Sequence, residues 1–220
     1  MCSRTTARSR TGRPRSAEAD TAILDATRAA LVELGWSKLT MGDVAARAGV
    51  AKTTLYRRWA NKSELVVDAV AVLFDELQLP DLGSLRADIE HVVLEFAALL
   101  ERPETKTALM AVVAESTRDE PLRDRIRASI VDRQKRLVLE GRQRAQERGE
   151  LPADRDPATV AAVDALIFDV VAGAVVNRSL VTAEPVDRAW AERLSALLVG
   201  GLSAAAESGT DALREPGAAR

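Results

Sequence analysis

Residues 39–65 read LTMGDVAARAGVAKTTLYRRWANKSEL, the pattern of two short helices joined by a tight turn. Thr40 can cap the first helix with its hydroxyl, and Asp43 stands three residues later, as in a capping box. Gly49 occupies the place where a helix ends in a left-handed residue, which glycine adopts most easily. The stretch therefore predicts a helix-turn-helix whose second helix ends near Trp59.

The second predicted helix places polar side chains around one apolar residue, Leu55. A recognition helix reads bases in the major groove with its N-terminal residues. Lysine can donate to guanine acceptors, and a threonine methyl can contact the thymine methyl. We expect base contacts from the start of this helix, by Lys52, Thr53 and Thr54. We expect contacts to phosphates, which carry no sequence information, from Tyr56, Arg58 and Trp59.

A third helix is predicted to follow directly. Asn61 is a favourable N-cap residue, with Glu64 three residues on. Lys62 then lies in the first turn, where free backbone N–H groups favour an anion, so a phosphate is the expected guest. Gly42 in the helix before the turn has no side chain to offer, and we expect little base reading from that helix.

Taken together, these residues resemble the DNA-binding domain of the TetR-type (tetracycline repressor-like) regulators. The similarity covers about residues 16–79, through an opening helix that ends ELGWSKLT and the motifs LTM, VAARAGV, TLYRRW and NKSEL. The resemblance implies an all-α homodimer, a palindromic operator, and a C-terminal domain that binds a ligand or dimerises. The family's DNA contacts map onto Thr40, Lys52, Thr53, Thr54, Tyr56, Arg58, Trp59 and Lys62.

Charge is divided unevenly along the chain. Residues 1–62 carry twelve Lys and Arg against five Asp and Glu, a net charge of +7, whereas residues 63–220 carry nineteen against twenty-eight, a net charge of −9. A basic N-terminal region on an acidic body indicates a DNA-facing module attached to a domain that does not bind DNA. Aromatic residues make up only 3% of the chain, so we expect a core of Ala, Leu and Val.

The fold class predicted is all-α: an N-terminal three-helix helix-turn-helix domain, then a larger helical C-terminal domain for dimerisation and ligand binding. The predicted segments are a disordered basic arm at 1–15, the DNA-binding domain at 16–62, the C-terminal domain at 63–206 and a disordered tail at 207–220. The arm carries five arginines and no acid. It could follow the DNA backbone or enter a minor groove, or it could be a solubilising tail.

The last two predicted helices, at about 157–181 and 187–206, are unusually apolar. An apolar helix of this kind needs more than one partner face, and two copies of a helix pair can bury such faces as a four-helix bundle. Burial in the core of one chain is the alternative. The residues expected at a dimer interface are Ile167, Val171, Val175, Trp190, Leu194, Leu197 and Leu198.

Asp164 and Asp169 interrupt one of these apolar helices, so each must be paired, hydrated or placed at a cavity. A bound ligand, Asn177 or Arg178 could supply the partner. The candidate ligand-binding residues are Phe96, Met110, Asp164, Phe168 and Asn177. Asp88, His91 and Glu95 have a spacing that could suit a metal, but we interpret them as a solvated face opposite Phe96 and expect no metal site.

The sequence argues against an enzyme, because it has no Gly-rich phosphate loop, no nucleophile elbow and no CxxC pair. No cofactor is expected. Cys2 is the one cysteine, so no intramolecular disulfide can form, which fits a reducing compartment. The apolar segment 158–176 is broken by two aspartates and the N-terminus lacks the apolar core of a signal peptide, so we expect a cytoplasmic protein without a membrane partner.

We therefore expect a homodimeric, sequence-specific DNA-binding regulator. The leading hypothesis is a repressor that leaves a palindromic operator when a small ligand binds its C-terminal domain. The alternative is an activator or architectural regulator whose C-terminal domain binds a protein or only dimerises. An internal cavity in that domain would favour the first.

Overall fold

The computed structural model describes residues 14–153 and 156–211, and over these residues the chain is helical with no strand. The helices are α1 Pro14–Lys38, α2 Met41–Arg47, α3 Lys52–Tyr56, α4 Lys62–Phe74, α5 Leu85–Glu101, α6 Pro103–Ser116, α7 Glu120–Ile126, α8 Asp132–Glu147, α9 Pro157–Val176 and α10 Arg188–Asp211. There are also two π-helical turns: η1 at Arg127–Val131, between α7 and α8, and η2 at Asn177–Val181, directly after α9. The predicted all-α fold is confirmed.

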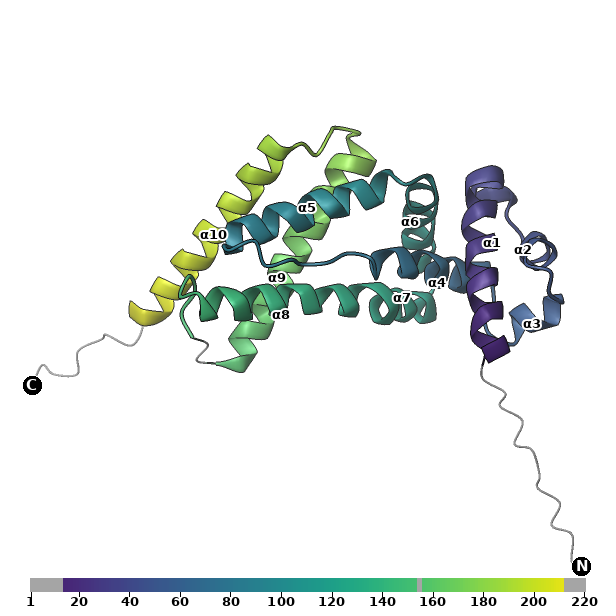
Figure 1. Cartoon of the computed structure of the whole chain (residues 1–220), viewed down its shortest axis with the longest axis horizontal. Coiled ribbons are helices and arrows are strands. Elements are labelled where there is room, and N and C mark those ends of the chain that lie inside the picture. Colours follow the sequence, from purple (N-terminus) through teal and green to yellow (C-terminus); the bar gives the residue numbers. More distant parts are fainter. Residues whose placement is uncertain (1–13, 154–155, 212–220) are drawn as a thin grey trace, which may run out of the picture.

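Helices α1, α2 and α3 form one end of the molecule, with α2 and α3 on its outer side (Figure 1). The predicted break after the first helix occurs at Gly35, whose φ of 72° interrupts the helical backbone before the chain reaches Lys38. Leu31 and Leu55 are fully buried beneath this group. Both belong to a buried apolar cluster that continues through α4 into the C-terminal helices.

The turn between α2 and α3 is set by Gly49, whose φ is 65°. Its N–H donates to the Ala46 carbonyl at 3.3 Å, and the Val50 N–H donates to the Ala45 carbonyl at 3.0 Å. This pair of bonds is a Schellman motif, which a glycine in left-handed conformation allows. The turn fixes the angle at which α3 leaves α2.

Helix α4 connects this end to the rest of the protein. It packs against α1 on one side and against α6 and α7 on the other. Most of its residues are buried, including Val66, Val67 and Val70. Through these contacts α4 joins the N-terminal helices to the rest of the described chain.

The remaining helices form the larger C-terminal body, in which α5 packs against α10 and lies beside α6, α8 and α9. Ser84 caps α5 by accepting from the Ala87 N–H at 3.2 Å. The π-helical turn η1 separates α7 from α8.

The predicted ends of the chain lie mostly outside the described residues. Of the basic arm at 1–15, only residues 14–15 fall inside them, and these begin α1. Helix α10 continues to Asp211, so the tail predicted from residue 207 begins at least five residues too early. Cys2 lies outside the described part of the chain.

Candidate DNA-binding surface and ligand cavity

Helix α3 presents the predicted reading residues to solvent. Lys52, Thr53 and Tyr56 are exposed, Thr54 is half-buried, and Leu55 faces inward with no exposed surface. Tyr56 keeps 54% of its surface although it is large and partly apolar. An exposed tyrosine ring beside a lysine and two threonines is suited to contact with a polar macromolecule. This exposed set is the expected start of a recognition helix.

Thr40 forms the capping box that the sequence predicts. Its hydroxyl donates to Asp43 Oδ2 at 2.6 Å and accepts from the Asp43 N–H at 3.2 Å, while its own N–H donates to Asp43 Oδ2 at 3.0 Å. The hydrogen bond from Thr40 is the main cause that lowers the pKa of the Asp43 carboxyl, and Arg47 and Lys52 lower it further. The Thr40 hydroxyl hydrogen is thus already used in a hydrogen bond within the protein. While that bond is present, the hydroxyl has no hydrogen left to donate to a phosphate, so a phosphate contact at Thr40 is less favourable than the sequence suggested.

Gly42 leaves room for the Lys52 side chain. A Cβ atom at this position would lie 2.8 Å from Cε and 2.9 Å from Nζ of Lys52. The lysine therefore crosses the first turn of α2 over the bare glycine backbone. Gly42 leaves the space in which the leading cation of α3 lies, although it contributes no contact itself.

Three of the predicted DNA contacts are occupied inside the protein. Trp59 is 5% exposed and its indole N–H donates to Asp68 Oδ2 at 2.8 Å, so it belongs to the core and not to the outward face. Helix α3 ends at Tyr56, and the chain past it turns inward, which is why extending the helix to Trp59 placed this ring wrongly.

Arg58 and Lys62 also bind the protein. Arg58 forms an ion pair with Asp20 of α1 and keeps only 18% of its side-chain surface. Lys62 Nζ donates to the Trp36 carbonyl at 3.0 Å and lies 4.4 Å from the centre of the Trp36 ring. Both cations fasten the recognition unit to α1, so any phosphate they meet would be shared with these partners.

Arg57 was missed by the sequence reasoning. It is the C-cap of α3, it is exposed, and within the described residues no carboxylate pairs with it. Continuing the helical spacing from Thr53 would have pointed to it, because Arg57 lies four residues further along. It is a better candidate for a phosphate contact than Arg58.

At the other end of α4, a cavity opens in the C-terminal body. The cavity has a volume of about 120 Å³ and is partly open to solvent. Phe74 at the end of α4 and Phe96 of α5 form one wall, with ring centres 5.9 Å apart. The full lining is apolar except for Asp88, Gln134 and Arg142, and it comes from α4, α5, η1, α8, α9, α10 and the segments around Leu79 and Leu151.

The cavity contains two of the five residues predicted to bind a ligand, Phe96 and Phe168. Asp164 is not a lining residue, and its carboxylate accepts from Arg142 Nε at 2.6 Å. Its partner therefore comes from α8 and not from Asn177, Arg178 or a ligand, as the sequence suggested. Met110 does not line this cavity, because it lies on α6 with 44% of its surface exposed. Asn177 does not line it either and is exposed in η2.

Asp88 is not the solvated residue that the sequence suggested. It has no exposed surface, and its carboxylate accepts from the Leu82 N–H at 2.8 Å and from Arg148 Nη2 at 3.0 Å. Arg148 also pairs with Asp81 and with Glu150, and the hydrogen bonds that it donates to Glu150 and then to Asp88 raise its pKa. Asp88 is the member of this ion-pair cluster that lines the cavity, and Arg148 supplies its counter-charge.

Comparison with known proteins gives these two sites a context. A model of the DNA-binding region described as bacterial regulatory proteins, tetR family, matches residues 23–69, and a model described as the tetracyclin repressor-like C-terminal domain matches residues 79–198. The chain belongs to the TetR family. It is a DNA-binding transcriptional regulator of this family and not an enzyme.

Individual TetR-family relatives cover most of the chain. An uncharacterized HTH-type transcriptional regulator of Mycobacterium bovis is 31% identical over 169 residues, which are 76% of this chain and 78% of the relative. A protein named DNA-binding transcriptional repressor TetR, from Mycobacteroides abscessus, is 31% identical over 178 residues, 79% of this chain and 87% of the relative. The crystal structure of a TetR family transcription regulator is 30% identical, with a TM-score of 0.69 and coverage of 84% of this chain and 98% of that one.

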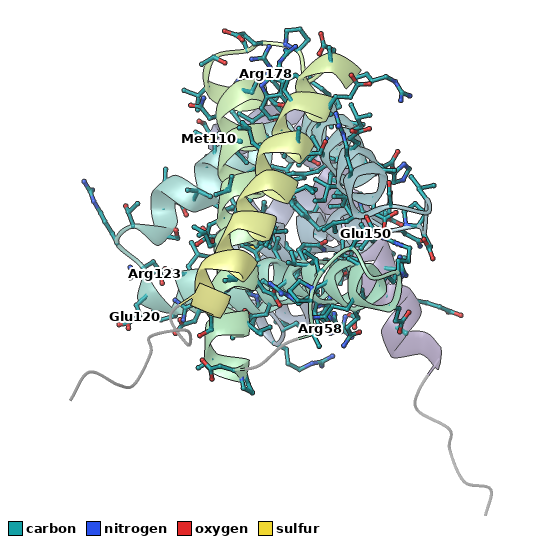
Figure 2. The ribbon with its side chains drawn as sticks, turned by 90° about the vertical axis from the view of Figure 1, so that its left-hand side faces the viewer. Arg58, Met110, Glu120, Arg123, Glu150 and Arg178 are labelled. Atoms are coloured by element: carbon teal, nitrogen blue, oxygen red, sulfur yellow. The ribbon has the colours of Figure 1, made fainter. Side chains whose placement is uncertain are left out.

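In this TetR-family chain α9 and α10 leave much apolar surface uncovered at the end away from α3. Leu166 and Val170 of α9 are 61% and 39% exposed, and Leu197 of α10 is 75% exposed. Figure 2 looks onto this end, where α10 runs along the face nearest the viewer. Residues 157–181 are long and apolar enough to span a membrane, and only 6% of the most apolar window is buried. Large exposed apolar faces mark interaction sites.

The residues predicted for a dimer interface mostly face the other way. Val175 and Leu194 are buried, Ile167 and Val171 line the cavity, Trp190 is half-buried with its ring under the Arg178 guanidinium, and Leu198 is half-buried. Only Leu197 of that set is strongly exposed. A helix that is apolar all round gives no polar face to orient it, so the sequence could not tell the inward side from the outward one.

Proposed function

We propose that the protein is a homodimeric repressor that binds a palindromic operator and is released from it by a small ligand. The observation that carries the proposal is the arrangement of two sites on α4. The helix begins at Lys62 beside the exposed α3 and ends at Phe74 in the cavity wall. A ligand with different affinity for two positions of α4 would shift the population between them.

The cavity supports ligand binding over the alternative of a C-terminal domain that only dimerises. Its lining is apolar with three polar side chains, the usual composition of a small-molecule site. The Mycobacteroides relative that is named a repressor supports the sign of regulation. Such a regulator would act in the cytoplasm, where its DNA is.

On the DNA side, we assign base contacts to Lys52, Thr53 and Thr54, and backbone contacts to Tyr56 and Arg57. Lys52 can donate to guanine acceptors, and the threonine methyls can contact thymine. Arg57 carries an exposed guanidinium at the end of α3, which suits a phosphate. The side chain of Lys52 is already extended over Gly42 and needs no unpairing before it meets DNA.

The dimer is proposed to form through the exposed sides of α9 and α10. Leu166, Val170 and Leu197 would be its apolar centre. At Gly173 and Gly200, no atom of a neighbouring element in the described chain lies within 4 Å of the place where a Cβ would be, so the space beside them is open. A two-fold axis across this face would bring four helices together as a bundle.

Selection of genomic fragments with the purified protein tests the DNA part of the proposal. We expect a palindrome to be recovered, with affinity that falls as salt rises. Lys52→Ala should relax the preferred sequence, whereas Arg57→Ala should weaken all sites alike and reduce the salt slope by about 1. The matched control is Lys106→Ala, which removes a lysine side chain from α6. Recovery of no preferred sequence would overturn the proposal.

Sedimentation or light scattering tests the dimer. Leu197→Asp places a charge in the proposed interface and should convert the dimer to a monomer at micromolar concentration. Met110→Asp places the same charge on an exposed apolar residue of α6 and should leave the dimer intact. A dimer that survives Leu197→Asp and Leu166→Asp would show that another face joins the copies.

A further inference from the structure

The polar groups of the cavity are almost all satisfied by the protein itself. Asp88 accepts from Arg148 and from the Leu82 N–H. Arg142 is paired with Asp164, and both side chains are nearly buried, at 11% and 13% exposed. Each charge in the lining therefore has its counter-charge, and a charged ligand would find no unpaired opposite charge there.

Gln134 is different. Its Nε2 donates to the Phe74 carbonyl at 2.8 Å, and because a carbonyl only accepts, this bond fixes which end of the amide is nitrogen. The other end, Oε1, is buried and has no hydrogen-bond partner within the described chain. Buried acceptors are nearly always paired in folded proteins, so the unpaired one indicates a missing donor. Gln134 lines the cavity, and a shift of its side chain would bring Oε1 within reach of a donor on a ligand there.

The surroundings of this oxygen are apolar. Ile130 and Leu137, one helical turn to either side of Gln134, also line the cavity, and Phe74 and Phe96 face them. Lys135 holds its ammonium 5.9 Å from the centre of the Phe168 ring, but it is not among the lining residues. A ligand in this space would bury hydrocarbon against most of the lining, whose three polar side chains are Gln134 and the already paired Asp88 and Arg142.

We propose that the effector is an uncharged, mainly apolar molecule with one hydrogen-bond donor, a hydroxyl or N–H, which binds Gln134 Oε1. Burial of hydrocarbon supplies most of the affinity, and the single hydrogen bond selects the donor-bearing ligand and sets its orientation. A carboxylate would have to lose its hydration without a free cation to replace it. The inference rests on the proposed function, since it names the ligand class of the same cavity.

A matched series of ten-carbon chains tests this class. N-phenyl-1-naphthylamine, an uncharged aromatic amine with one N–H, serves as the fluorescent reporter, and 1-decanol, decyl methyl ether and decanoate compete with it. The ether is more apolar than the alcohol but has no donor. We expect decanol to bind roughly fivefold to tenfold more tightly than the ether, the value of one neutral hydrogen bond, and decanoate to bind most weakly.

Two methionine variants in the same wall separate the hydrogen bond from packing. Gln134→Met removes the acceptor while keeping an unbranched side chain, and it should reverse the order of alcohol and ether. Leu137→Met keeps the polar set and nearly conserves volume, and it should leave the order unchanged. Circular dichroism and thermal unfolding show whether each variant is folded, and Gln134→Leu provides a second apolar replacement.

The inference is overturned if the reporter does not bind, if decanoate competes as well as decanol, or if Gln134→Met shifts alcohol and ether equally. Operator release is measured separately on the same samples. Binding in the expected order without release of DNA would reject the proposed ligand-triggered release while the ligand class stands. Release by decanoate alone would reject the ligand class while leaving ligand-triggered release intact.

Discussion

The contact between α4 and α7 provides the sharpest energetic test of how the two parts of the chain are joined. Arg125 of α7 donates to Asp68 Oδ1 at 3.0 Å and Oδ2 at 2.6 Å, and to Glu64 Oε2 at 3.3 Å. Asp68 Oδ2 also accepts from the Trp59 indole, just past α3. Hydrogen bonds to Asp68 are the main cause that raises the Arg125 pKa.

We expect Arg125→Met to lower the free energy of unfolding by about 2 kcal/mol. Breaking a buried ion pair costs about 3–5 kcal/mol, because it leaves an unpaired charge, whereas an exposed pair is worth about 0–1 kcal/mol. The side chains of Arg125, Asp68 and Glu64 are 30%, 26% and 21% exposed, between these limits. The variant also leaves two carboxylates one turn apart on α4, which repel each other.

Urea unfolding of a double-mutant cycle with Asp68→Asn measures the effect. Asparagine keeps an oxygen for the Trp59 indole, so the cycle isolates the link to Arg125. We expect a coupling energy of about 1–2 kcal/mol. Arg123→Met, on the exposed side of α7, is the control and should change stability by less than about 0.5 kcal/mol. A coupling energy near zero would refute the view that this ion pair fastens α4 to the C-terminal body.

Three other substitutions probe the DNA-binding end. Gly42→Ala should raise the free energy of unfolding by up to about 1 kcal/mol, since alanine has a higher helix propensity than glycine. It should also weaken operator binding, because its Cβ would displace the Lys52 side chain. Stronger operator binding by this variant would contradict the account. Thr40→Val should raise the pKa of Asp43 toward its ordinary value of 3.8, whereas Thr40→Ser should keep it low, as carboxyl NMR titration would show. Because the folded pKa is depressed, the stability linked to Asp43 is present above pH 3.8 and is lost as the pH falls through the folded value, so the valine variant should lose this acid dependence. Trp59→Phe keeps a buried ring but removes the indole N–H, and thermal unfolding should report a loss of about 1 kcal/mol.

The local signals in residues 39–65 were strong enough to predict the recognition unit. A capping box, a glycine in left-handed conformation and an N-cap asparagine each act over three or four residues, so sequence spacing alone specifies them. Thr40, Gly49 and Asn61 all have the backbone roles expected of them. The errors at Arg57 and Trp59 arose because α3 ends at Tyr56, earlier than helical spacing suggested.

Long-range partners could not be read in this way. The pairing of Asp164 with Arg142 joins residues 22 apart, and the bond from Arg148 to Asp88 joins residues 60 apart. Such contacts depend on how whole helices cross, and periodicity within one helix does not fix that. The same limit explains α9, where an all-apolar surface left the inward side undetermined, so Ile167 and Val171, which line the cavity, were predicted to lie at a dimer interface.

Hydroxyl-radical footprinting on the selected operator tests the central claim, that two copies of α3 read two half-sites. The account predicts two protected patches related by a two-fold axis, with centres about 34–36 Å apart or at a multiple of that distance. Both patches should fade together in Lys52→Ala and persist in Lys106→Ala. A single unpaired patch, or protection that spreads along the fragment and is indifferent to Lys52, would contradict it.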